Sequence, residues 1–118
     1  MDNLVLYCKS YHKDADRVVN LSYSINKHNV DNLPFYISVP SKDLSLFKSK
    51  NITNAILIED ENIDNNNGGW VGQQVIKSQF WKLNLCKNYL CLDSDSEFIR
   101  DFKESDFIYK EDIPYTVV

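Results

Sequence analysis

Two aspartates, Asp93 and Asp95, are separated by one residue and directly follow a short apolar run. Carboxylate oxygens are the ligands that hard divalent cations prefer, and an anionic ligand and waters could complete the octahedral shell of Mg²⁺ or Mn²⁺. The apolar run, residues 89–92, suits a strand that is buried on both faces. We therefore expect both carboxylates at the carboxyl edge of a sheet, where open α/β sheets bind ligands. The alternative is a polar turn, because Asp and Ser are common turn residues.

The rest of the chain alternates strand patterns with helix patterns, as a sheet that presents these carboxylates requires. The expected strands are residues 4–8, 34–40, 55–58 and 89–92. The expected helices run from a cap at Asp14 to about His28, from a cap at Ser41 through Phe47, and from Trp70 to about Lys87. Strand–helix–strand crossovers require parallel pairing and right-handed connections. The predicted fold is a single α/β domain, a Rossmann-like three-layer sandwich with a mainly parallel sheet.

Composition and charge limit the possible functions. A chain of 118 residues fits one domain, and 43% hydrophobic with 25% charged residues is typical of a globular protein. The net charge is -4, and residues 93–112 hold eight acids against three bases, which argues against a nucleic-acid partner. The apolar run before Lys9 is far too short for a signal or transmembrane segment. We therefore expect a chain that is cytoplasmic or faces the cytoplasm.

The three cysteines are predicted to be buried, reduced thiols. Cys8 and Cys91 fall inside apolar strand-like runs, and Cys86 closes the expected long helix. A zinc site would require paired ligands at closer spacing, and a secreted disulfide scaffold would require more cysteines in a shorter chain.

The last part of the sequence also has strand character, at residues 107–109 and 115–118. The sequence stops inside the second of these runs, at Val117 and Val118. Chains rarely end on exposed apolar strand residues. We therefore expect a fragment of a longer protein, with pairing of exposed edges or a homodimer as the consequence.

One combination of motifs resembles a known family. The pattern is Gly69-Trp70-x-x-Gln73-Gln74-x-x-Lys77, an amphipathic helix, and then the strand that leads into Asp93-Ser94-Asp95. It is similar to the nucleotide-sugar-binding half of a GT-A glycosyltransferase with an Asp-x-Asp motif, and the resemblance covers nearly all of residues 1–118. It implies the metal-dependent transfer of a sugar from a nucleoside diphosphate sugar to an unknown acceptor. The family's second half, with the acceptor site and the catalytic base of inverting members, has no counterpart here.

The resemblance also implies roles for particular residues. Asp95 would be the ligand of Mn²⁺ or Mg²⁺, and Asp93 would be shared between the metal and the ribose or sugar; no catalytic residue is assigned. Lys77 is favoured over Lys82 as a contact to the donor, because Gln73 lies one turn earlier on the same side and the two lysines are about 140° apart. The implied donor-binding set is Ser10, Tyr11, Asp60, Gln73, Lys77, Asp93, Ser94 and Asp95.

Two of these positions carry further expectations. The loop from Ser10 to His12 would lie beside the nucleobase and ribose, with Tyr11 offering an aromatic face, unless it is an ordinary surface loop. Asp60 follows the third strand and could hydrogen-bond the base or ribose, although its polar surroundings favour exposure to solvent.

Other classes of protein also place aspartates at this spacing. A haloacid-dehalogenase-like phosphatase requires Thr or Val two residues after the second aspartate, where this chain has Glu97. An EF-hand loop requires glycine at its sixth position, where this chain has Phe98. The alternative that remains is a non-catalytic sugar-nucleotide-binding or interaction domain of the same fold.

Overall fold

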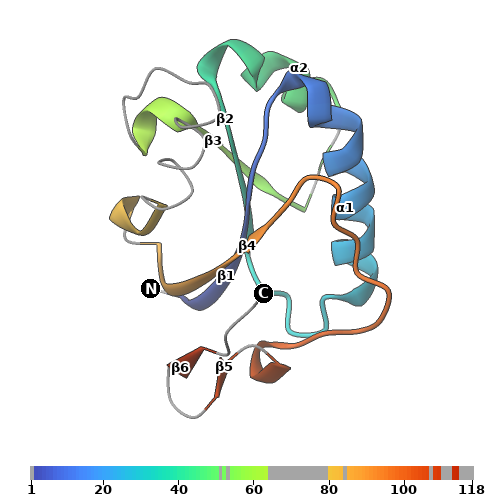
Figure 1. Ribbon diagram of the computed structural model, residues 1–118, viewed down its shortest axis with the longest axis vertical. Coiled ribbons are helices and arrows are strands. Elements are labelled where there is room, and N and C mark those ends of the chain that lie inside the picture. The colour runs from blue at the N-terminus through green and yellow to red at the C-terminus, as the bar shows by residue number, and fades with distance from the viewer. Residues whose placement is uncertain are drawn as a thin grey trace.

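A four-stranded parallel sheet forms the centre of the molecule (Figure 1). The computed structural model describes residues 2–50, 52, 54–63, 80–83, 85–106, 108–109 and 113–114. The sheet has the order β3-β2-β1-β4, and its strands are β1 (Asp2–Lys9), β2 (Phe35–Val39), β3 (Ile56–Glu59) and β4 (Cys86–Leu92). All three pairings are parallel, which confirms the predicted α/β class and is compatible with a Rossmann-like fold.

Helices and short 3-10 turns connect the strands. In the described part of the chain the helices are α1 (Ala15–His28) and α2 (Leu44–Ser49). The 3-10 turns there are η1 (His12–Asp14), η2 (Ser41–Asp43), η3 (Asp60–Asn62), η4 (Phe80–Leu83) and η5 (Glu104–Asp106). Val18 and Leu21 of α1 and Phe47 of α2 are fully buried in one cluster with Leu6 of β1. Both helices therefore cover the same face of the sheet, and the predicted end of α1 at His28 is confirmed.

A second apolar cluster covers the opposite face. Phe80 of η4 stacks on Tyr7 of β1, with 4.0 Å between ring centroids, and packs edge-on against Tyr89 of β4. Figure 1 shows η4 and α1 on opposite sides of the sheet. The chain thus changes face between β3 and β4, and β4 joins the sheet on the other side of β1. The strand order reverses between β1 and β4, which is the point where open α/β sheets bind ligands.

The predicted long helix is wrong at its C-terminal end. Residues 70–79 lie outside the described part of the chain, but Phe80–Leu83 forms a 3-10 turn and β4 already begins at Cys86. Cys86 pairs with Asp2 of β1, so pairing with the central strand overrides the local helical pattern. The strand is also less buried than predicted, because Leu90 is buried but Cys91 is exposed. The prediction of three buried thiols therefore holds only for Cys8 and Cys86.

Neither predicted helix cap is formed by its side chain. Asp14 is the residue before α1, but its carboxylate lies 3.6 Å from Arg17 and makes no capping hydrogen bond. Ser41 lies in η2, and α2 begins only at Leu44. The Ser41 hydroxyl instead donates to the Glu59 carboxylate over 3.2 Å, which ties η2 to the end of β3.

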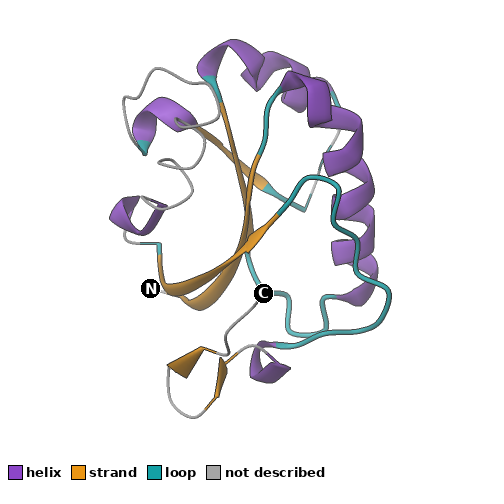
Figure 2. Cartoon of the chain, viewed as in Figure 1, coloured by secondary structure: helices purple, strands orange, loops and turns teal. Residues whose placement is uncertain are grey.

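After β4 the chain reverses and runs back along α1, as the loop beside this helix in Figure 2 shows. The Phe98 amide donates to the Ser24 hydroxyl over 3.0 Å, and Phe102 forms a parallel bridge with Asn29. β5 (Ile108–Tyr109) and β6 (Ile113–Pro114) then form a small antiparallel pair. The strand predicted at residues 107–109 is confirmed for the last two of them, and residues 115–118 lie outside the described part. Among the described helices, none is long and apolar enough to cross a membrane.

Candidate functional site

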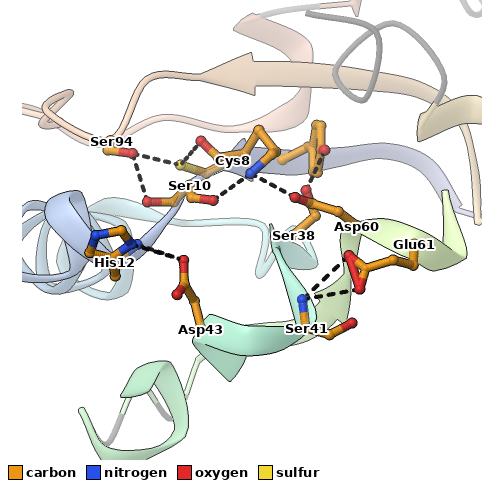
Figure 3. Close-up of polar contacts among 11 residues, drawn as sticks. Cys8, Ser10, His12, Ser38, Ser41, Asp43, Asp60, Glu61 and Ser94 are labelled. Carbon is orange, nitrogen blue, oxygen red and sulfur yellow. Dashed lines mark hydrogen bonds and ion pairs between the residues drawn. The ribbon is translucent and has the colours of Figure 1, made fainter. Parts of the chain in front are cut away.

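The carboxyl edge of the sheet gathers polar side chains from all four strands (Figure 3). Lys9 ends β1 and Ser10 follows it, Ser38 lies near the end of β2, Asp60 follows β3, and Ser94 follows β4. Parallel strands bring their carboxyl ends to one edge, so this gathering follows directly from the topology.

Two buried serines join β1 to β4 at the point where the strand order reverses. The Ser94 hydroxyl donates to the Ser10 hydroxyl over 3.0 Å, and the Cys8 thiol lies 3.7 Å from Ser94. Ser94 is buried, whereas its neighbours Asp93 and Asp95 are exposed. The middle residue of the Asp-x-Asp motif thus anchors a turn that presents both carboxylates to solvent.

The turn itself is closed by a backbone hydrogen bond. The Ser96 amide donates to the Asp93 carbonyl over 3.0 Å. The structure therefore shows the polar turn that was the alternative interpretation of the motif, and it places this turn at the carboxyl edge where a ligand site was expected. Within the described part of the chain, no three His, Cys, Asp or Glu side chains gather as a metal site. Any cation held by Asp93 and Asp95 would need further oxygens from a bound ligand and water.

A buried ion pair lies beneath this edge. The Lys9 ammonium is 2.9 Å from the Asp60 carboxylate, and the two side chains are 2% and 12% exposed. Lys9 also donates to the Ser10 carbonyl. The other carboxylate oxygen of Asp60, Oδ1, is buried and has no hydrogen-bond partner among the residues that the structure describes. The prediction that Asp60 is exposed to solvent is therefore wrong. The carboxylate can be buried because the Lys9 ammonium compensates its charge.

Two buried hydroxyl groups lie next to this ion pair, and Ser38 is hydrogen-bonded to Asp60. Ser38 and Tyr7 share a hydrogen bond of 2.6 Å. Burial raises the pKa of Tyr7, and burial also raises the pKa of Asp60, against the lowering effects of hydrogen bonds from Lys9 and Ser38. Neither Lys9 nor Ser38 was among the residues predicted to bind the donor. The available signal was their position, since each is a polar residue within or directly after an apolar strand.

This network gives stability a dependence on pH. The pKa of Asp60 is higher in the folded protein than its ordinary value of 3.8, so protonation of Asp60 stabilises the fold. This stabilisation is complete below pH 3.8 and is lost as pH rises through the folded pKa. In Lys9→Met the lowering effect of the ammonium disappears, so the pKa of Asp60 should rise further. We expect urea unfolding between about pH 4 and pH 7 to show a steeper loss of stability for Lys9→Met than for the wild type. Parallel pH profiles would contradict this.

The structure brings together four of the residues predicted to bind the donor. Ser10 and Ser94 are in contact, with Asp93 and Asp95 on either side of Ser94. Tyr11 is partly buried beside this group, and Asp60 lies beneath it in contact with Lys9, as described above. Gln73 and Lys77 lie outside the described residues.

The fold and the site define the molecule as an α/β domain whose candidate ligand edge carries two exposed carboxylates beside a strand-order reversal. No protein-family model, curated protein or solved structure matches the chain. A functional assignment therefore depends on the chemistry of this edge.

Proposed function

We propose that the chain binds the sugar donor of a metal-dependent glycosyltransferase of the GT-A type, which transfers a sugar from a nucleoside diphosphate sugar to an acceptor. The observation that carries this proposal is the placement of Asp93 and Asp95. Both are exposed, on a turn anchored by Ser94 at the end of β4, beside the loop that follows β1. That is the edge at which parallel sheets bind nucleotides and related ligands.

The two carboxylates fit a hard divalent cation such as Mn²⁺ or Mg²⁺. Asp95 would bind it directly, and Asp93 would be shared with the ribose or sugar. Two carboxylates leave most of the octahedral shell unfilled, which suits a cation that the diphosphate of the donor helps to bind. When bound, the cation neutralises the charge that develops on the leaving diphosphate.

Other residues of the chain would position the donor. Ser10 and Ser94 hold the β1 and β4 ends together, so the turn keeps a fixed place relative to the β1 loop. Tyr11, partly buried on that loop, offers an aromatic face to the nucleobase. Oδ1 of Asp60 is buried and has no hydrogen-bond partner among the described residues. An N–H group of the base or an O–H group of the ribose would supply that hydrogen bond. The proposed contacts of Gln73 and Lys77 with the sugar donor are supported by the sequence pattern alone.

The proposal is tested by calorimetric titration of uridine, guanosine and thymidine diphosphate sugars with Mn²⁺ and with a chelator. We expect binding only when the metal is present, because the carboxylates alone repel a diphosphate. Binding that is equally strong in chelator would contradict the proposal. If binding depends on the metal but no acceptor receives the sugar, the chain is a sugar-nucleotide-binding domain without transfer activity.

A further inference from the structure

A histidine and a buried carboxylate face each other at the carboxyl edge of the sheet. His12 lies in η1, after β1, and Asp43 lies in η2, after β2. Asp43 Oδ2 accepts a hydrogen bond from the His12 backbone amide over 2.9 Å and lies 3.3 Å from His12 Nδ1 (Figure 3). The Asp43 side chain is only 8% exposed, whereas that of His12 is 49% exposed. The carboxylate is therefore a fixed support, and the imidazole is open to solvent.

The pairing fixes which ring nitrogen can meet a ligand. A carboxylate accepts hydrogen bonds, so Nδ1 of His12 carries a proton toward Asp43. Nε2 is then the nitrogen left for a ligand. In the protonated ring both nitrogens are donors, so Nε2 can then donate to an anion.

We propose that His12, oriented by Asp43, donates a charge-assisted hydrogen bond from Nε2 to a phosphate oxygen of the bound donor. This inference rests on the proposed function, because it assigns a contact to the diphosphate in the same site. His12 lies two residues after Ser10, which contacts the centre of the Asp-x-Asp turn. The ammonium of Lys9, at the same edge, is already held by Asp60. When protonated, His12 would therefore offer an oriented positive charge at the same edge of the sheet as two carboxylates that would otherwise repel a diphosphate.

The charged groups around His12 are consistent with this role. From η2, Asp43 contacts the ring, and the neighbouring Lys42 is exposed. On its own segment, Tyr11 meets the ring edge-on at 5.5 Å, and Lys13 is exposed. Asp14, the next acid along the chain, lies against Arg17. Among these contacts the Asp43 carboxylate is the charged group that directly faces the imidazole.

The chain supplies an internal control for the experiment. It has two histidines, and the second, His28, lies at the other end of α1 with its Nδ1 3.0 Å from the Asp101 carboxylate. His28 therefore has the same kind of partner but lies away from the carboxyl edge. A ligand effect on His12 that His28 does not share cannot come from a general change in buffer or fold.

The test is a proton NMR titration of both imidazoles against pH, with Mg²⁺ alone and with Mg²⁺ plus UDP-glucose, GDP-mannose or TDP-glucose. The diphosphate of these sugars is a diester and does not titrate near neutral pH. We expect the donor that binds to raise the pKa of His12 and to leave that of His28 unchanged, because a phosphate stabilises the imidazolium.

Binding measurements complete the test. His12→Gln should weaken donor binding about tenfold below the pKa of the imidazole, whereas His28→Gln should not change it. A pKa of His12 that falls or stays constant on donor binding would overturn this inference alone, and a fall would indicate a neutral imidazole that accepts a hydrogen bond from a hydroxyl group. Unchanged affinity in His12→Gln would also overturn this inference alone. If none of the donors binds with Mg²⁺ or Mn²⁺, this inference and the proposed function both fail.

Discussion

Replacing Lys9 by methionine is expected to lower the free energy of unfolding by about 3–5 kcal/mol at neutral pH. The substitution keeps an unbranched side chain, shorter by one atom, and removes its charge. Asp60 would then be left with a buried carboxylate that has lost its ammonium, since the Lys9 and Asp60 side chains are only 2% and 12% exposed. An uncompensated buried charge is among the most destabilising changes a single substitution can make.

A double variant and a surface control separate this effect from lost packing. Lys9→Met combined with Asp60→Asn leaves no buried charge and should recover a large part of the loss. Lys50→Met removes an ammonium that is also 2.9 Å from a carboxylate, that of Asp16, but this pair is 31% and 90% exposed. It should cost at most about 1 kcal/mol. Urea unfolding of the four proteins measures all of these values, and equal losses in Lys9→Met and Lys50→Met would contradict the account.

Most of the sheet could be predicted from the sequence, because apolar strand runs and helix patterns alternate along the chain. The parallel order of the predicted strands also predicts that Ser10 and Ser94 lie at one edge, where the structure shows them in contact. Topology alone was sufficient for this, since parallel strands must end together.

The ion pair of Lys9 and Asp60 could not be predicted in this way. In the sequence Lys9 opens a polar loop after an apolar run and Asp60 lies in a polar tract, so nothing in the pattern marks the two charges as partners. Only the pairing of β2 with both β1 and β3 brings the ends of β1 and β3 near enough for the charges to meet. The helix predicted to reach Lys87 failed for a related reason, because the hydrogen bonds of β1 extend β4 back to Cys86.

The second large effect is expected at the Asp-x-Asp turn. Asp95→Asn keeps the shape of the side chain but removes the charge that would hold the cation. We expect Asp95→Asn to abolish the gain in donor affinity that the metal gives, a gain of about 5–150-fold. Asp93→Asn should reduce this gain less. Both residues are exposed, so neither substitution should alter the folded structure.

Glu97→Gln is the matched control for Asp95→Asn. Glu97 is also exposed and lies two residues further along the same segment, so the substitution removes the same charge from nearly the same place. Donor binding should keep its full dependence on metal in Glu97→Gln. If both variants lose affinity equally, the effect is one of overall charge and not of a metal ligand.

The most direct test of the proposed donor site is the coupling between metal and nucleotide. Mn²⁺ would be titrated into the wild type, Asp95→Asn and Glu97→Gln, each with and without the nucleoside diphosphate sugar that binds best. Thermodynamic linkage requires the sugar nucleotide to strengthen Mn²⁺ binding by the same factor as Mn²⁺ strengthens binding of the sugar nucleotide. We predict reciprocal coupling in the wild type and Glu97→Gln and none in Asp95→Asn. Absence of coupling in the wild type, or equal coupling in Asp95→Asn, would contradict the proposal and leave the motif as a polar turn.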